Sequence, residues 1–189
     1  VRFLQSTFPA YARPDFLINS GGSKTFPRFR QGGHVVGSAN ELAVGSALLK
    51  PADFDAPILA ALQPALFVAD PVLKRMSPGQ LPVAEWAGTL WRIWDRGRED
   101  VLYVYGGGWD VRPVYPAGLR SNPLYNSRPV DTRIPNQTLL NVAAKHPIRP
   151  GDFVFYRPQQ GDVMTQFEEI WVVRGGQILD VWHPLPHRL

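Results

Sequence analysis

The 189-residue sequence contains no cysteine. A disulfide framework, a thiolate metal site and a cysteine nucleophile are therefore excluded. The sequence also has no run of about 18 or more apolar residues, and its first residues lack the basic and apolar regions of a signal peptide. We therefore expect neither a membrane span nor a signal peptide, and the lack of cysteine fits a cytoplasmic protein.

The chain also lacks a strong charge of one sign. Charged residues make up 19% of it, which is ordinary for a folded protein, and the formal net charge is +4. The basic residues are scattered, and Arg28 and Arg30 form the one close pair beside an aromatic residue, Phe29. Nucleic-acid binding requires basic residues clustered on one face, so no nucleic-acid partner is expected. Hydrophobic residues make up 44% of the chain, which is enough for a folded core.

Residues 1–75 have the pattern of an α/β region. Short apolar runs are each followed by a turn signal, which is typical of buried strands. A short helix is expected over residues 53–62, with Asp53 or Asp55 as its N-cap. The predicted strands are Phe16–Asn19, Glu41–Ser46 and Ala65–Ala69.

From residue 76 onward the pattern is that of β-strands. Runs rich in Val, Tyr, Trp and Phe are separated by glycine-containing turns. The last two runs, 169–173 and 178–182, flank Gly175-Gly176 and predict a hairpin. The other predicted strands are 90–95, 101–105 and 153–156. This region is expected to form a mainly antiparallel barrel or sandwich.

One segment could hold a phosphate. The first predicted strand runs into Asn19, Ser20, Gly21, Gly22 and Ser23. Glycine lets the backbone approach an anion, and hydroxyl groups add hydrogen-bond donors. A plain turn at the end of a strand is the structural alternative, and the segment is not a Walker motif.

Two other candidate motifs favour structural roles. Gly106-Gly107-Gly108 follows a strand and suits tight backbone packing or a bulge. His183 and His187 have a chelating spacing, but the prolines between them prevent the helix that such a pair needs.

The order of these motifs resembles a known family. Ile18–Thr25, Asn40–Ser46, Pro51–Asp55 and Pro64–Val68 are similar, in that order, to the last barrel segments of the alanine-racemase-fold aldolases and deaminases. Further along the chain, five more segments resemble the β domain of that family: Tyr105–Trp109, Asn136–Leu140, Gly151–Phe155, Thr165–Ile170 and Val173–Trp182. The chain thus resembles the C-terminal part of a D-threonine aldolase or D-serine dehydratase.

The resemblance implies a fold and a cofactor. Residues 1–75 would be the terminal βα units of an incomplete (β/α)₈ barrel that binds pyridoxal 5′-phosphate, and residues 76–189 would be the β domain. A complete barrel needs about 250 residues, and the Schiff-base lysine of the family is expected upstream of Val1. Lys24 is the rival lysine, although it lies elsewhere in the family pattern. The cofactor phosphate is expected on Asn19, Ser20, Gly21, Gly22, Ser23, Gly45 and Ser46.

The sequence departs from the family at its metal site. Arg157 stands where many relatives have a metal-binding histidine, and Asp162 stands at an acidic position. Because arginine cannot ligate a metal, Asp162 is the one metal candidate left, and the departure speaks against a divalent cation.

The implied activity is that of a lyase. The full-length protein would cleave or dehydrate a D-3-hydroxy amino acid such as D-threonine or D-serine, and this chain alone would be inactive. A non-catalytic cofactor- or metabolite-binding member, an amino acid racemase and a plain β-rich binding module are alternatives. A homodimer, or association with the preceding part of the barrel, is the expected assembly.

Overall fold

The computed structural model describes residues 2–12, 17–31, 34–35, 39–77, 97, 99–122 and 136–184. The chain divides into two compact units, and each is treated by itself. One unit comprises Val1–Ala65 and Gln160–Leu189, and the other comprises Leu66–Gln159. The boundary expected at residue 75 lies inside a strand of the second unit, β5 (Val68–Met76). No helix within the described ranges is long and apolar enough to cross a membrane.

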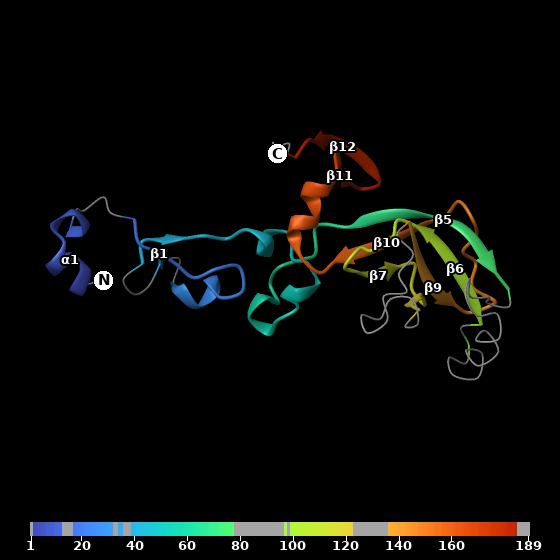
Figure 1. Cartoon of the computed structure of the whole chain (residues 1–189), viewed down its shortest axis with the longest axis horizontal. Helices are drawn as coiled ribbons and strands as arrows, with labels where there is room; N and C mark the ends of the chain where they lie inside the picture. The colour runs from blue at the N-terminus through green and yellow to red at the C-terminus, as the bar shows by residue number, and fades with distance from the viewer. Residues whose placement is uncertain are drawn as a thin grey trace. The chain divides into compact units, whose positions relative to one another are not determined.

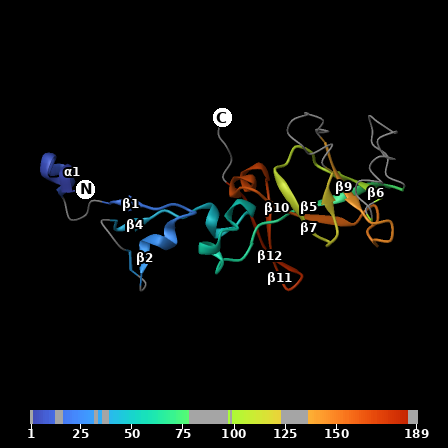
Figure 2. The ribbon, with the colours of Figure 1, turned by 90° about the horizontal axis from the view of Figure 1, so that it is seen from below.

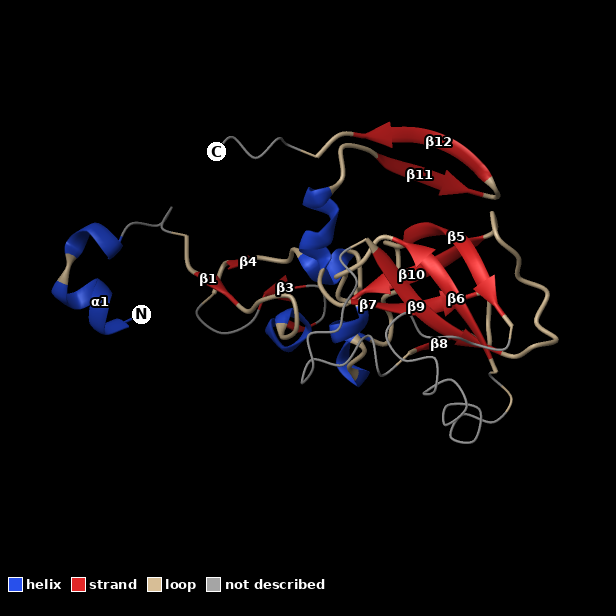
Figure 3. Cartoon of the chain, turned by 45° about the vertical axis from the view of Figure 1, so that its right-hand side comes forward, coloured by secondary structure: helices blue, strands red, loops and turns tan. Residues whose placement is uncertain are grey.

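The second unit is a six-stranded antiparallel sheet (Figures 1 and 3). Its strand order is β7-β10-β5-β6-β9-β8. Besides β5, the strands are β6 (Asp100–Tyr105), β7 (Val111–Tyr115), β8 (Arg120–Ser121), β9 (Gln137–Val142) and β10 (Phe153–Pro158). The end strands β7 and β8 are neighbours in the chain and also contact each other, so the sheet nearly closes into a barrel. The mainly antiparallel architecture predicted from residue 76 onward is confirmed for the strands of this sheet. The predicted last hairpin belongs to the first unit.

The core of this unit is made by aliphatic residues together with the buried Tyr103 and Tyr156. Val104, Leu139, Leu140 and Val154 are fully buried. The run Val101–Val104 is buried at every position, and this is why its sequence is apolar throughout rather than alternating. The strand predicted at residues 90–95 lies outside the described residues.

One arginine fastens this sheet to a neighbouring loop. Arg75, on β5, pairs with the buried Asp100 at 2.7 Å. Its guanidinium also donates hydrogen bonds to four backbone carbonyl oxygens, those of Ala143, Ala144, His146 and Ile148. This arrangement uses the fork of donors that only arginine provides.

The N-terminal segments of the first unit are short helices and short strands. They are α1 (Arg2–Thr7), η1 (Pro9–Ala12), β1 (Asn19–Ser20), η2 (Phe26–Phe29), β2 (Arg30–Gln31), β3 (His34–Val35), β4 (Glu41–Leu42), η3 (Ser46–Leu48), η4 (Ala52–Phe54) and η5 (Pro57–Leu59). β1 and β4 are parallel, and β2 and β3 are antiparallel. Of the described residues of the strand expected at 16–19, only Asn19 belongs to β1, which continues to Ser20. Of the strand expected at 41–46, only the first two residues form β4.

The prediction of a helix over residues 53–62 is wrong. Two 3₁₀ turns, η4 and η5, replace it, and neither has a side-chain N-cap. Pro57 explains the break, because proline disfavours a helical conformation in the residue before it. Ala56 accordingly has an extended backbone, with ψ at 145°.

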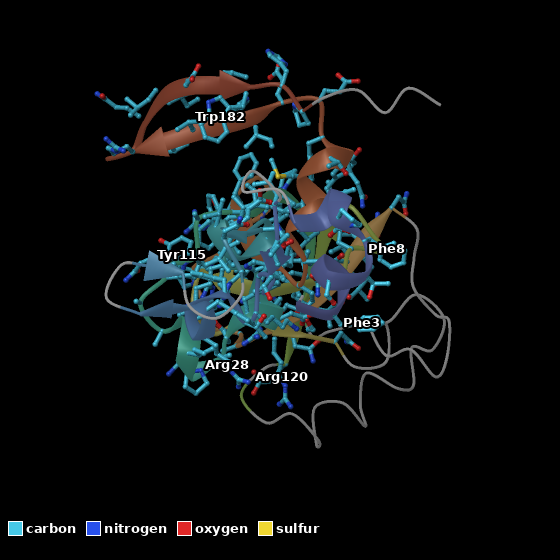
Figure 4. All side chains as sticks on the ribbon, turned by 90° about the vertical axis from the view of Figure 1, so that its left-hand side faces the viewer. Phe3, Phe8, Arg28, Tyr115, Arg120 and Trp182 are labelled. Carbon is cyan, nitrogen blue, oxygen red and sulfur yellow. The ribbon has the colours of Figure 1, made fainter. Side chains whose placement is uncertain are left out.

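The C-terminal part of this unit begins with η6 (Gly161–Gln166) and ends with the predicted hairpin, β11 (Ile170–Arg174) and β12 (Gln177–Trp182). Gly175 and Gly176 have φ values of 58° and 77°, as the primed hairpin turns require. Trp182, on β12, is more than half exposed and donates its indole N–H to Asp180 Oδ2 at 3.0 Å (Figure 4).

Candidate functional site

Two glycine turns follow the parallel pair of strands in the first unit. Asn19 lies opposite Glu41, and Ser20 lies opposite Leu42. The side-chain amide of Asn19 donates to Glu41 Oε1 at 2.7 Å, which ties the two strands together. Because the strands are parallel, their C-terminal ends lie at the same end of the pair. β1 and β4 lie side by side (Figure 2), and residues 21–23 and 45–46, predicted to share one phosphate, follow them at the same end of the pair.

The first turn has one glycine that the backbone requires and one that it does not. Gly21 has φ at +77°, and a Cβ there would lie 3.0 Å from the Phe29 ring. Gly22 has no such constraint, because a Cβ added to it would meet nothing within 4 Å. The carbonyl of Gly22 accepts from the N–H groups of Thr25 and Phe26 and so closes the turn. The space beside Gly22 is open to a ligand.

Ser23 connects the two turns. Its Oγ accepts a hydrogen bond from the Gly45 N–H at 3.1 Å. The Gly45 N–H, expected to face a phosphate, is thus already used within the chain. In the part of the chain that the structure describes, the N–H groups of Gly22 and Ser23 donate to no partner. The Ser23 hydroxyl can also donate its own hydrogen while its oxygen accepts from Gly45.

The second turn is anchored by a small core. Ala47, Phe54 and Leu59 are buried together, and Phe26, Val44 and Leu62 pack around them. Ser46 begins η3 immediately before Ala47, so burial of Ala47 fixes the position of the Ser46 turn. We name the two turns, Gly21–Ser23 and Gly45–Ser46, the phosphate cradle, after the ligand that the sequence analysis predicts for them. Asn19 and Ser20 belong to the strand before it, and the Asn19 amide is engaged by Glu41.

Lys24 is directed to the same core. Its Nζ lies 5.2 Å from the centre of the Phe54 ring, in a cation–π contact. Lys50 is buried, and its Nζ donates to the carbonyl of Leu62 at 2.6 Å. Both lysines of this unit that the structure describes thus have a structural contact.

The two residues considered at the metal position lie in different units. Arg157 is a buried residue of β10, opposite Arg112 of β7. Asp162 is exposed in the first turn of η6. Across the described ranges, no three His, Cys, Asp or Glu side chains are grouped as a metal site would need.

Nothing in the sequence indicated that Gln160 and Gly161 lie near the cradle. Gln160 Nε2 donates a hydrogen bond to Asp53 Oδ2. Gly161 is buried against Ser46, and a Cβ at Gly161 would lie 3.1 Å from both Cβ and Oγ of Ser46. Because 107 positions separate Gln160 from Asp53, no local pattern could have shown this contact.

Comparison with solved structures identifies a protein of similar fold. No family model matches the chain, and no curated protein matches it. Among solved structures, the chain resembles a D-threonine aldolase. The match is to the crystal structure of the enzyme from Filomicrobium marinum, with a TM-score of 0.60 and 19% identity. It covers 94% of this chain and 43% of that chain.

The sequence identity and the coverage of this match limit the conclusion to the fold. At 19% identity it shows a shared fold and no more, and the chain spans less than half the length of the aldolase. The expected relationship to the D-threonine aldolase group is thus confirmed for the fold. The near-closed antiparallel sheet of the second unit agrees with the β-barrel domain of that fold.

Proposed function

We propose that the chain is part of a pyridoxal-phosphate-dependent enzyme that acts on D-amino acids, and that the phosphate cradle holds the cofactor phosphate. The observation that carries the proposal is the hydrogen bond from the Gly45 N–H to Ser23 Oγ. This bond joins the two glycine turns that follow the C-terminal ends of β1 and β4. The fold likeness to a D-threonine aldolase supports the assignment.

The residues of the cradle fit a phosphate dianion. The N–H groups of Gly22 and Ser23 and the hydroxyl of Ser23 are donors, and the open space at Gly22 allows an oxygen to approach the backbone. Hydrogen bonds from neutral donors to a charged group are each worth about 1.5–3 kcal/mol. A few such bonds would hold a phosphate monoester in preference to its dephosphorylated form.

When bound, pyridoxal phosphate supplies the electron sink for a carbanion at the amino acid Cα. The chain's own contribution is to bind and orient. The cradle fixes the phosphate end, and the core of Ala47, Phe54 and Leu59 fixes the cradle. The lysine and the base would come from other parts of the enzyme.

Binding of pyridoxine 5′-phosphate tests the proposal directly. This probe lacks the aldehyde, so it cannot react with surface lysines, and calorimetry should show it binding more tightly than pyridoxine. Gly22→Val should weaken its binding about tenfold or more, because the new side chain fills the space beside the donors. The fold should tolerate this change, since a Cβ at Gly22 meets no other atom of the chain.

Ala10→Val is the matched control, because it adds methyl groups at an exposed residue of η1, outside the cradle. It should leave binding of the probe unchanged. Equal affinity for pyridoxine and its phosphate, or normal binding by Gly22→Val, would contradict the proposal.

The reaction is assigned by its products in the protein that carries the preceding barrel segments. Aldol cleavage of D-threonine releases glycine and acetaldehyde, dehydration of D-serine releases ammonia and pyruvate, and a racemase forms the L-enantiomer. We expect a lyase product. Exclusive formation of the enantiomer would establish the racemase alternative instead.

A further inference from the structure

The segment at the start of η6 lies against the phosphate cradle. A Cβ at Gly161 would come within 3.1 Å of Ser46 Cβ and Oγ and within 3.2 Å of Ser46 Cα. Contacts this short are tighter than those ordinary side chains make, and one of them is to backbone. Any side chain at Gly161 would therefore displace the Ser46 turn itself rather than a flexible side-chain tip.

The same segment is fastened by a hydrogen bond. Gln160 donates through Nε2 to Asp53 Oδ2, and Asp53 is a residue of η4. Phe54, the next residue, is buried in the core that also contains Ala47. The Gln160 amide thus connects η6 to the element that anchors the second turn of the cradle. Gln160 and Gly161 are adjacent, so one bond sets how closely the backbone of Gly161 approaches Ser46.

We propose that Gln160 and Gly161 are positioning residues for the phosphate cradle. The inference rests on the proposed function for its ligand, but the geometry on which it depends can be measured without one. In the described part of the chain, neither residue is hydrogen-bonded to Gly22 or Ser23. Both act through Ser46, by holding the Gly45–Ser46 turn against Ser23, whose Oγ accepts the Gly45 N–H.

A swap of the hydrogen-bonding groups tests the role of Gln160. Gln160→Glu sets two carboxylates against each other and should separate η6 from η4. The double variant Asp53→Asn with Gln160→Glu restores an amide–carboxylate hydrogen bond with donor and acceptor exchanged. Pyridoxine 5′-phosphate should bind about tenfold more weakly to Gln160→Glu, and the double variant should regain the original affinity.

Amide NMR spectra provide a readout that needs no ligand. In Gln160→Glu and in Gly161→Ala, the Gly45 and Ser46 signals should shift, and the double variant should return them to their original positions. Gln166→Glu is the matched control for an added charge, because Gln166 is an exposed residue at the other end of η6. It should change neither the Gly45 signals nor the affinity.

The two proposals fail in different ways. If the unaltered chain binds pyridoxine 5′-phosphate no better than pyridoxine, the proposed function is wrong, and the spectra still decide whether Gln160 positions the turn. If the unaltered chain binds the phosphate preferentially, but Gln160→Glu and Gly161→Ala bind it normally with unshifted Gly45 signals, the positioning role alone is overturned. Loss of affinity that the double variant does not restore would also overturn it.

Discussion

Asp70 should make the second unit, Leu66–Gln159, less stable as the pH rises. Its side chain lies in β5 and is only 8% exposed. Burial raises the pKa of Asp70 from 3.8 to about 6. Burial, and after it the charge of Asp70, also raises the pKa of the Tyr156 hydroxyl above its ordinary range. Asp70 is therefore a carboxyl group for which the folded protein favours the protonated form.

The sign and size of the effect follow from this shift. A group whose pKa is higher in the folded state binds its proton more tightly there, so it favours folding at low pH. That contribution is complete below the unfolded pKa and is lost as the pH rises from about 4 to about 6. Each pKa unit corresponds to about 1.4 kcal/mol, and a shift of about two units therefore costs about 2–3 kcal/mol at neutral pH.

Asp70→Asn isolates this contribution, because asparagine has nearly the same shape and does not titrate. The free energy of unfolding of the variant relative to the original chain should rise by about 2–3 kcal/mol between about pH 4 and about pH 8. Urea unfolding followed by tryptophan fluorescence measures the difference at each pH. The difference cancels the titration of the other carboxyl groups, which both proteins share. If it were the same at both ends of this range, the assigned pKa of Asp70 would be wrong.

Two further substitutions test the structural contacts. Arg75→Met would leave the buried Asp100 without its cation, so urea unfolding should show a free energy of unfolding lower by about 3–5 kcal/mol. Adding Asp100→Asn to this variant should recover part of the loss. A change below about 1 kcal/mol for Arg75→Met would show that the ion pair does not stabilise the sheet. Gly21→Ala should cost about 1–2 kcal/mol, because φ at +77° is unfavourable for any residue with a Cβ; an unchanged midpoint would mean that the turn adopts another conformation.

Local patterns in the sequence were sufficient for several strands. Val101–Tyr105 is rich in strand formers, and it forms β6 together with Asp100. Gly175-Gly176 between two apolar runs predicted the hairpin of β11 and β12, because two residues with positive φ are what a tight hairpin turn requires. The glycine at position 21 is likewise explained by its own backbone conformation.

The sequence was less informative where proline and burial compete with propensity. Residues 53–62 have a helical pattern, but Pro57 divides them into two 3₁₀ turns. Strand lengths also differed from the prediction, since the apolar run at 41–46 forms only the two residues of β4. After β4 the chain turns so that Ala47 enters the core, and a pattern of apolar letters does not show where that turn begins.

The sequence by itself determined the residue types of the cradle, namely three glycines, two serines and a strand before each turn. Only the tertiary structure decided that the turns meet, because the parallel pairing of β1 with β4 joins segments 22 positions apart through Ser23 and Gly45. The same holds for Gln160 and Gly161, whose partners lie more than a hundred positions away. Contacts at such separations depend on how the whole chain packs, and no local periodicity encodes them.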